Sequence, residues 1–203
     1  MFFYIDKEAE FKMNTYILLD AFHGTDLSNA ESIMKSGFKC RPNKHHWLGN
    51  GIYFYMDYSL AKWWTTNPTS KFGVKIKNPA IIKCKIYVKN DNLLDLRRLK
   101  DYTKFVEIYR NEFLPFLFCG ELSSLSEDTI DTRTLRCTYC DYLNLKYNYK
   151  VIIGTFYLPT QPYMPTDYGK FFDTFNISYI ESQICVFDSN TISSMELVSI
   201  DRR

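Results

Sequence analysis

The sequence predicts an α+β domain with a mainly antiparallel β-sheet flanked by short helices. Strand-length apolar runs outnumber the segments that show a clear helical period. One of these runs, at 80–88, alternates apolar residues with lysines, which is typical of a strand with one buried face. The length of 203 residues favours a single domain over residues 1–203, and a composition with 46% hydrophobic and 24% charged residues excludes long disorder.

Capping residues, turns and helix-stop signals place the other elements. Gly37 ends the first helix, because glycine readily adopts the positive φ that follows a helix C-terminus. An Asn-Pro pair at 67–68 ends the second helix. In chain order, the predicted elements are a strand at 16–21, a helix capped by Ser28 or Asn29, a strand at 52–55, a helix capped by Asp57 or Ser59, a strand at 80–88, a helical stretch at 94–112, and strands at 151–158, 182–187 and 195–200. The polar segment 122–149 predicts no clear element, and three prolines mark 159–169 as a loop.

The net charge of +2 is unevenly distributed along the chain. Residues 1–35 hold 3 basic and 6 acidic side chains, residues 36–110 hold 15 and 5, and residues 111–203 hold 7 and 12. The central excess of positive charge fits a surface that follows nucleic-acid phosphates. It fits equally well the solvated face of a lysine-bearing strand. The charge therefore permits a nucleic-acid partner without requiring one.

Neither a membrane span nor a signal peptide is predicted. No window reaches the 18 or so consecutive apolar residues of a spanning helix, and residues 1–10 turn acidic without a basic stretch. We therefore expect a cytoplasmic protein, with no membrane partner, whose six cysteines are reduced thiols. Cys137 and Cys140 form one close pair, but no second pair of ligands follows them, so we expect no metal site.

Three short motifs contain the residues suited to chemistry. The first is F-H-G-T at 22–25, at the end of a predicted strand. The second is L-G-N-G-I-Y-F at 48–54, ahead of a predicted helix, and the third is Q-I-C-V-F-D at 183–188. Taken singly, a histidine at a strand end or a tyrosine in a strand is most simply a structural residue. Any function must therefore be inferred from the three motifs together.

In this order and spacing, the motifs resemble the catalytic domain of poly(ADP-ribose) polymerase-like ADP-ribosyltransferases, the diphtheria-toxin-like His-Tyr-Glu clade. That family has H-G-[ST], a helix ending in glycine, G-x-G-I-Y-F, and a late strand of the form E-Y-[IV]-V-Y-D. The resemblance implies an ADP-ribosyltransferase-like domain with a split sheet, and NAD as co-substrate with no metal. It extends to stand-alone microbial members, some of which are toxins, and so implies an antitoxin protein as a partner.

The resemblance also implies roles for individual residues. His23 would bind the adenosine ribose, and the backbone of Gly24, within the H-G-T motif that ends at Thr25, would bind the nicotinamide amide. Tyr53 would stack on the nicotinamide ring. Trp64 falls where the family often has a second aromatic ring, although a place in the core explains it as well.

The third motif departs from the family at one position. Where the polymerising members have glutamate, this sequence has Gln183, which keeps hydrogen bonding but lacks the charge that stabilises a cationic transition state. Chain elongation is therefore not expected. Glu181 would share a strand face with Gln183, because residues i and i+2 point the same way. It is a candidate base toward an incoming amine, guanidine or hydroxyl, and it is equally well explained as a solvated residue at the strand entrance.

The predicted function is NAD-dependent mono-ADP-ribosyl transfer to a macromolecule, with release of nicotinamide. The central positive charge slightly favours a nucleic-acid acceptor, RNA before DNA, in a toxin or anti-phage effector. A protein acceptor is a close alternative. A catalytically inactive binding module that keeps the NAD pocket would explain Gln183, and an NAD glycohydrolase would share every NAD contact while using water as acceptor.

Overall fold

The computed structural model describes residues 15–43, 46–67, 76–118, 131–156, 174, 180–198 and 200. The strands are β1 (Tyr16–Asp26), β2 (Ile52–Tyr55), β3 (Pro79–Lys89), β4 (Leu93–Asp95), β5 (Val151–Phe156), β6 (Glu181–Val186) and β7 (Ile192–Val198). The α-helices are α1 (Leu27–Ser36), α2 (Tyr58–Thr66), α3 (Leu99–Ile108), α4 (Leu114–Phe118) and α5 (Thr132–Tyr147); a π-helical segment (Tyr109–Phe113) joins α3 to α4, and single 3₁₀ turns lie at Asn90–Asn92 and Ser189–Thr191. The predicted α+β class is confirmed.

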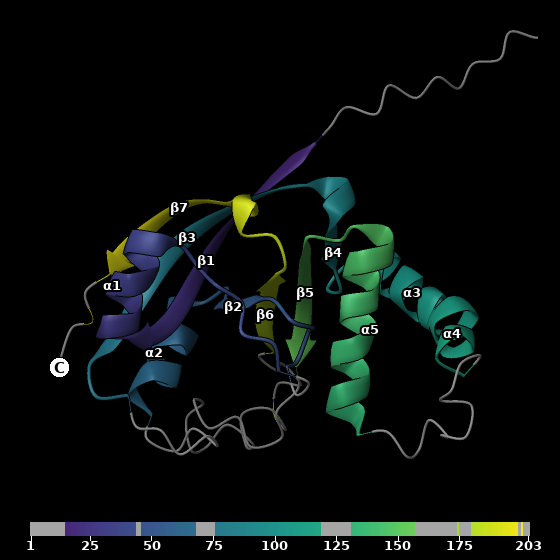
Figure 1. Cartoon of the computed structure of the whole chain (residues 1–203), viewed down its shortest axis with the longest axis horizontal. Coiled ribbons are helices and arrows are strands. Elements are labelled where there is room, and N and C mark those ends of the chain that lie inside the picture. Colours follow the sequence, from purple (N-terminus) through teal and green to yellow (C-terminus); the bar gives the residue numbers. More distant parts are fainter. Residues whose placement is uncertain are drawn as a thin grey trace, which may run out of the picture.

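The described strands form one mixed sheet in the order β4-β5-β6-β2-β1-β3-β7 (Figure 1). Strands β4 and β5 run parallel, and the other pairings are antiparallel. Strands β1 and β3 pair from Tyr16 with Lys89 to Asp26 with Pro79. In the described part of the chain, by contrast, β1 pairs with β2 at one position, Phe22 with Tyr55. Strands β1 and β2 are still hydrogen-bonded neighbours at this short contact, so the described strands belong to one sheet. The division into two half-sheets stays a prediction.

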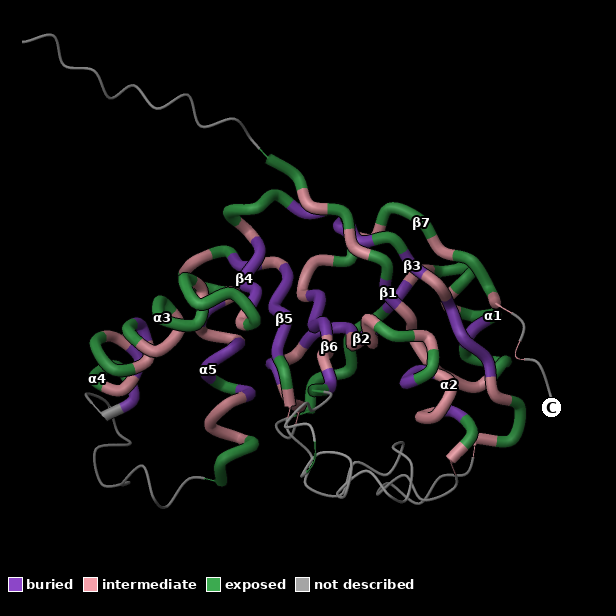
Figure 2. Tube along the Cα trace, turned by 180° about the vertical axis from the view of Figure 1, so that it is seen from behind, coloured by how far each residue is buried: buried purple, intermediate pink, exposed green. Residues whose placement is uncertain are grey.

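Two hydrophobic cores lie on the two sides of the sheet. The first core joins α1 to strands β1, β2 and β3 and includes Ala21, Ala30 and Phe54. The second core joins the sheet to the helices at its β4–β5 end and includes Leu143 and Cys185. Figure 1 shows α1 and α2 at the β3–β7 end of the sheet and α3, α4 and α5 at the other end, and Figure 2 shows long buried stretches along β3 and β5. The central strands β2 and β6 lie between these two groups of helices.

The first half of the chain follows its predicted elements closely, with shifted ends. Strand β1 extends to Asp26, so the H-G-T motif lies inside the strand and not after it. Asp26 also caps α1, since its carboxylate accepts a hydrogen bond from the Ser28 N–H (3.1 Å), and the predicted cap at Ser28 or Asn29 is therefore wrong. Gly37 follows α1 with φ 76°, and Asp57 caps α2, as predicted.

The second half differs more from its prediction. The segment predicted to be helical from residue 94 begins as strand β4, and its helix starts only at Leu99. The segment with no predicted element contains α5, which Asp131 caps and which Asn148 ends in the left-handed conformation (φ 57°). The loop predicted at 159–169 lies outside the described residues. Among the described helices, none is long and apolar enough to cross a membrane.

Candidate active site

His23 and Tyr53 are directly linked, although they are 30 residues apart. The Nδ1 atom of His23 lies 2.8 Å from the carbonyl oxygen of Tyr53. Because a carbonyl oxygen only accepts hydrogen bonds, Nδ1 carries the proton, and Nε2 of the neutral ring remains an acceptor. The imidazole packs edge-on against Phe38 and Phe54, at ring-centre distances of 5.1 and 5.8 Å. The first two motifs therefore meet at a histidine with a fixed tautomer.

Burial lowers the pKa of His23 below its ordinary 6.5, against the smaller opposing effect of the Tyr53 carbonyl. The folded protein therefore takes up a proton at this ring less readily than the unfolded chain does. It follows that the stabilising contribution of the neutral ring is present above pH 6.5 and is lost as the pH falls below that value. We expect the free energy of unfolding to decrease between about pH 7.5 and about pH 5.5, measured by urea denaturation. His23→Gln should remove part of this decrease, and an unchanged pH dependence in that variant would contradict the assignment.

The phenol of Tyr53 is occupied by the turn that precedes β2. Its hydroxyl donates to the Gly49 carbonyl oxygen (2.8 Å) and accepts from the Leu48 N–H (2.6 Å). Burial, above all, raises the pKa of the phenol far above its ordinary value of 10. The hydroxyl therefore fixes the turn and stays protonated. The ring itself lies 5.3 Å from the imidazole of His46, and its stacking on nicotinamide stays a prediction.

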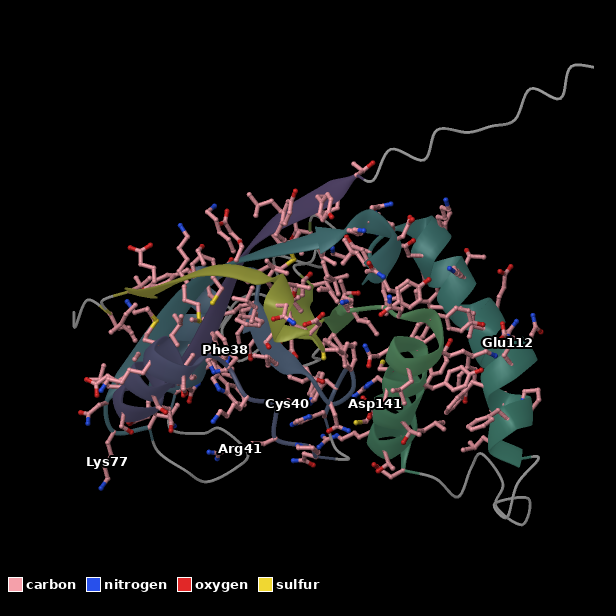
Figure 3. The ribbon with its side chains drawn as sticks, turned by 45° about the horizontal axis from the view of Figure 1, so that its top comes forward. Phe38, Cys40, Arg41, Lys77, Glu112 and Asp141 are labelled. Carbon is pink, nitrogen blue, oxygen red and sulfur yellow. The ribbon has the colours of Figure 1, made fainter. Side chains whose placement is uncertain are left out.

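The same turn is held from the other side by Asp141 on α5 (Figure 3). The backbone N–H and the side-chain amide of Asn50 donate to the two carboxylate oxygens of Asp141, at 2.6 and 2.7 Å. The Asn50 side-chain oxygen accepts from the N–H of Asn43 at 2.7 Å. Asp141 is not among the predicted site residues, because it lies in the segment where no element is predicted. Asp141 therefore joins the candidate site as a positioning residue.

Glu181 and Gln183 contact each other at the start of β6. The side-chain N–H of Gln183 donates to a carboxylate oxygen of Glu181 at 2.5 Å, and Glu181 is only 3% exposed. Glu181 is therefore not the solvated residue that one interpretation of the sequence suggests. Gln183 stands between Tyr55 of β2 and Gly154 of β5. Its amide is oriented with the N–H toward Glu181, which leaves the amide oxygen as an acceptor.

The structure does not gather all the predicted residues on one face. Tyr53 pairs with Cys185 on β6, so strand alternation places the side chains of Tyr53, Glu181 and Gln183 on the second-core side. His23 packs with Phe54 on the first-core side. His23 therefore meets Tyr53 through its backbone carbonyl, at the short contact between β1 and β2.

Gly24 lies directly beneath α2. A Cβ atom at this position would lie 2.6 Å from Thr65 Cγ2 and 2.7 Å from the Ala61 carbonyl oxygen. The H-G pair therefore has a packing reason for its glycine as well as the NAD contact that the resemblance implies. Thr25 pairs with Ala80 on β3. Trp64 lies within α2 and is half-buried, and its role as a second ring beside nicotinamide stays a prediction.

The close cysteine pair lies within α5. Both Cys137 and Cys140 are buried, and burial, above all, raises the pKa of Cys137 to about 11, which keeps this thiol protonated. Within the described ranges, no group of three or more His, Cys, Asp or Glu side chains gathers around a common point. The described cysteines are free thiols.

The family model of the poly(ADP-ribose) polymerase catalytic domain matches residues 3–93. The match contains the first two motifs, and the third lies beyond it. An uncharacterized protein of Methanocaldococcus jannaschii is 33% identical over 100 residues, which are 48% of this chain and 46% of the relative. The chain thus spans about half the length of this curated relative. No solved structure matches the chain.

Proposed function

We propose that the protein is an NAD-dependent mono-ADP-ribosyltransferase that releases nicotinamide and transfers ADP-ribose to a macromolecule. The observation that carries the proposal is the hydrogen bond between His23 Nδ1 and the Tyr53 carbonyl oxygen. It joins the two motifs that lie inside the match to the poly(ADP-ribose) polymerase catalytic domain. Domains of that kind use NAD as co-substrate.

The arrangement around β6 suits the chemistry of this transfer. When the bond between nicotinamide and ribose breaks, its electron pair leaves with nicotinamide and positive charge develops on the ribose. The free oxygen of the Gln183 amide is suited to accept a hydrogen bond from a ribose hydroxyl. The acceptor then forms the new bond to the ribose carbon, and its proton passes to the carboxylate of Glu181. Glu181 thus supplies the carboxylate base that the amide of Gln183 cannot provide.

The proposed acceptor is a nucleic acid, RNA before DNA. Support comes from residues 36–110, where basic side chains outnumber acidic ones 15 to 5. A base amine in a single strand is accessible without being flipped out of a duplex. A protein side chain is the alternative acceptor. Because the motifs resemble those of stand-alone microbial ADP-ribosyltransferases, some of which are toxins, we further propose a toxin or anti-phage role, with an antitoxin as partner.

Incubation of the pure protein with labelled NAD tests the proposal. Total RNA, DNA and cell-extract protein are supplied separately as acceptors, and a folded His23→Ala/Tyr53→Ala variant serves as the blank. We expect labelled RNA with the wild-type protein and none with the blank. Label on protein would support the proposed transferase activity but show that the acceptor is a protein. Nicotinamide release without label would indicate an NAD glycohydrolase, and NAD binding without turnover would indicate the inactive binding module.

A further inference from the structure

Arg136, on α5, is a half-buried cation that packs against two aromatic rings. Its guanidinium carbon lies 5.4 Å from the ring centre of Trp47 and 5.3 Å from that of Phe156. These two rings meet edge to face, with their centres 4.5 Å apart. Trp47 comes from the turn before β2 and Phe156 from the end of β5. Three elements distant in sequence therefore fix the position of one guanidinium group.

One nitrogen of this guanidinium lacks a hydrogen-bond acceptor among the described residues. It is Nε, which is buried and donates to no group in the part of the chain that the structure describes. Of the ion pairs formed by residues that the structure describes, none includes Arg136. Burial lowers its pKa, whereas the opposing effect of Asp131 at the start of α5 is small. Because buried polar groups are nearly always hydrogen-bonded, this arrangement indicates an anion that binds from outside.

The Arg136 guanidinium lies beside the proposed catalytic residues. Phe156, which covers the guanidinium, pairs with Glu181 across β5 and β6. Glu181 in turn contacts Gln183. An anion bound at Arg136 would therefore lie next to the place where the ribose reacts.

We propose that Arg136 binds a phosphate group at the edge of this site, with Trp47 and Phe156 holding the guanidinium in place. The planar fork of a guanidinium matches two phosphate oxygens, and stacking on aromatic rings keeps it oriented. The inference rests on the proposed function. The phosphate has two possible sources, the diphosphate of NAD and a backbone phosphate of the acceptor strand, and binding experiments distinguish them.

The test compares Arg136→Gln with Arg133→Gln, a matched control that removes an exposed arginine one turn earlier on α5. Calorimetry measures the affinities for ADP-ribose, a short single-stranded RNA and nicotinamide. We expect Arg136→Gln to weaken the binding of a phosphate-bearing ligand about tenfold or more, while nicotinamide binding is unchanged. Arg133→Gln should change all three by less than about twofold.

The two sources give different results. Weaker ADP-ribose binding alone assigns the site to the diphosphate of NAD. The alternative result is weaker RNA binding, together with a slope of log K against log salt concentration that is smaller by about one. This result assigns the site to a backbone phosphate of the acceptor strand. If Arg136→Gln weakens neither ligand more than the control does, the proposal is overturned.

A second variant keeps the test decisive if Arg136→Gln does not fold. Arg136→Lys retains a cation over the two rings but loses the fork, so we expect it to bind inorganic pyrophosphate several-fold more weakly than the wild type does. Equal pyrophosphate affinity in the two proteins would overturn the phosphate site. This measurement involves no NAD turnover. It can therefore succeed even if the labelling experiment shows that the protein is not a transferase.

Discussion

Replacement of Glu181 by glutamine is expected to lower the rate of ADP-ribosyl transfer at least about 100-fold while NAD still binds. Glutamine has nearly the same shape and keeps an oxygen that can accept the hydrogen bond from Gln183. It cannot, however, take up the proton that the attacking acceptor releases. Single-turnover transfer from labelled NAD measures the loss, and calorimetry measures NAD affinity separately.

Ser182→Ala is the matched control for this substitution. Ser182 precedes Gln183 on β6 and pairs with Thr155, so strand alternation directs its side chain to the opposite face. We expect nearly wild-type transfer from this variant. Wild-type transfer in Glu181→Gln would remove Glu181 from the mechanism, and a parallel loss of NAD affinity would assign it to substrate binding.

Replacement of Gly24 by alanine is expected to decrease the free energy of unfolding by about 1–3 kcal/mol and to weaken NAD binding as well. The added methyl group would lie 2.6 Å from Thr65 Cγ2 and 2.7 Å from the Ala61 carbonyl oxygen. The second contact is with backbone, so rotation of a side chain cannot relieve it. Helix α2 must therefore move away from β1 and take Trp64 with it. Urea denaturation and NAD titration measure the two effects.

A second substitution separates the two contacts. Adding Thr65→Ala to Gly24→Ala removes the clash with the methyl group of Thr65 but leaves the clash with the Ala61 carbonyl. We therefore expect the double variant to recover only part of the lost stability. A Gly24→Ala protein with the wild-type denaturation midpoint would show that α2 is not closely packed on β1.

The elements that the sequence predicted well depend on local signals. The alternation at 80–88 appears in β3, where Ile82, Cys84 and Ile86 are buried and Lys85 is exposed. Gly37 ends α1 as its backbone freedom predicts. Such features are determined by a residue and its near neighbours, so one sequence is enough to find them.

The features that were missed depend on distant contacts. Helix α5 buries Cys137, Tyr139, Cys140 and Leu143, a face with a single aliphatic residue, so the segment lacks an obvious apolar period. Asp141 gains its role only because the chain brings the turn at Asn50 against that helix, 91 residues away. Strand β4 is defined by its pairing with β5, which is distant in the sequence.

The candidate site was predicted in the same uneven way. The shared face of Glu181 and Gln183 follows from strand geometry alone. The proton position on His23 and the anchoring role of the Tyr53 hydroxyl could not be predicted. Both depend on hydrogen bonds to backbone carbonyl groups, and because every residue has such a group, the sequence does not show which one accepts the bond.

The short contact between β1 and β2 affects how long the candidate site stays assembled. His23 packs against Phe38 and Phe54 of the first core, and the ring of Tyr53 packs against the second core. Among the described residues, β1 and β2 pair at one position, beside the hydrogen bond from His23 to the Tyr53 carbonyl. Local opening at this contact would separate the two residues while β2 stayed paired with β6. The lifetime of the site is therefore set by the short β1–β2 contact, and a dinucleotide that binds both strands would keep it closed.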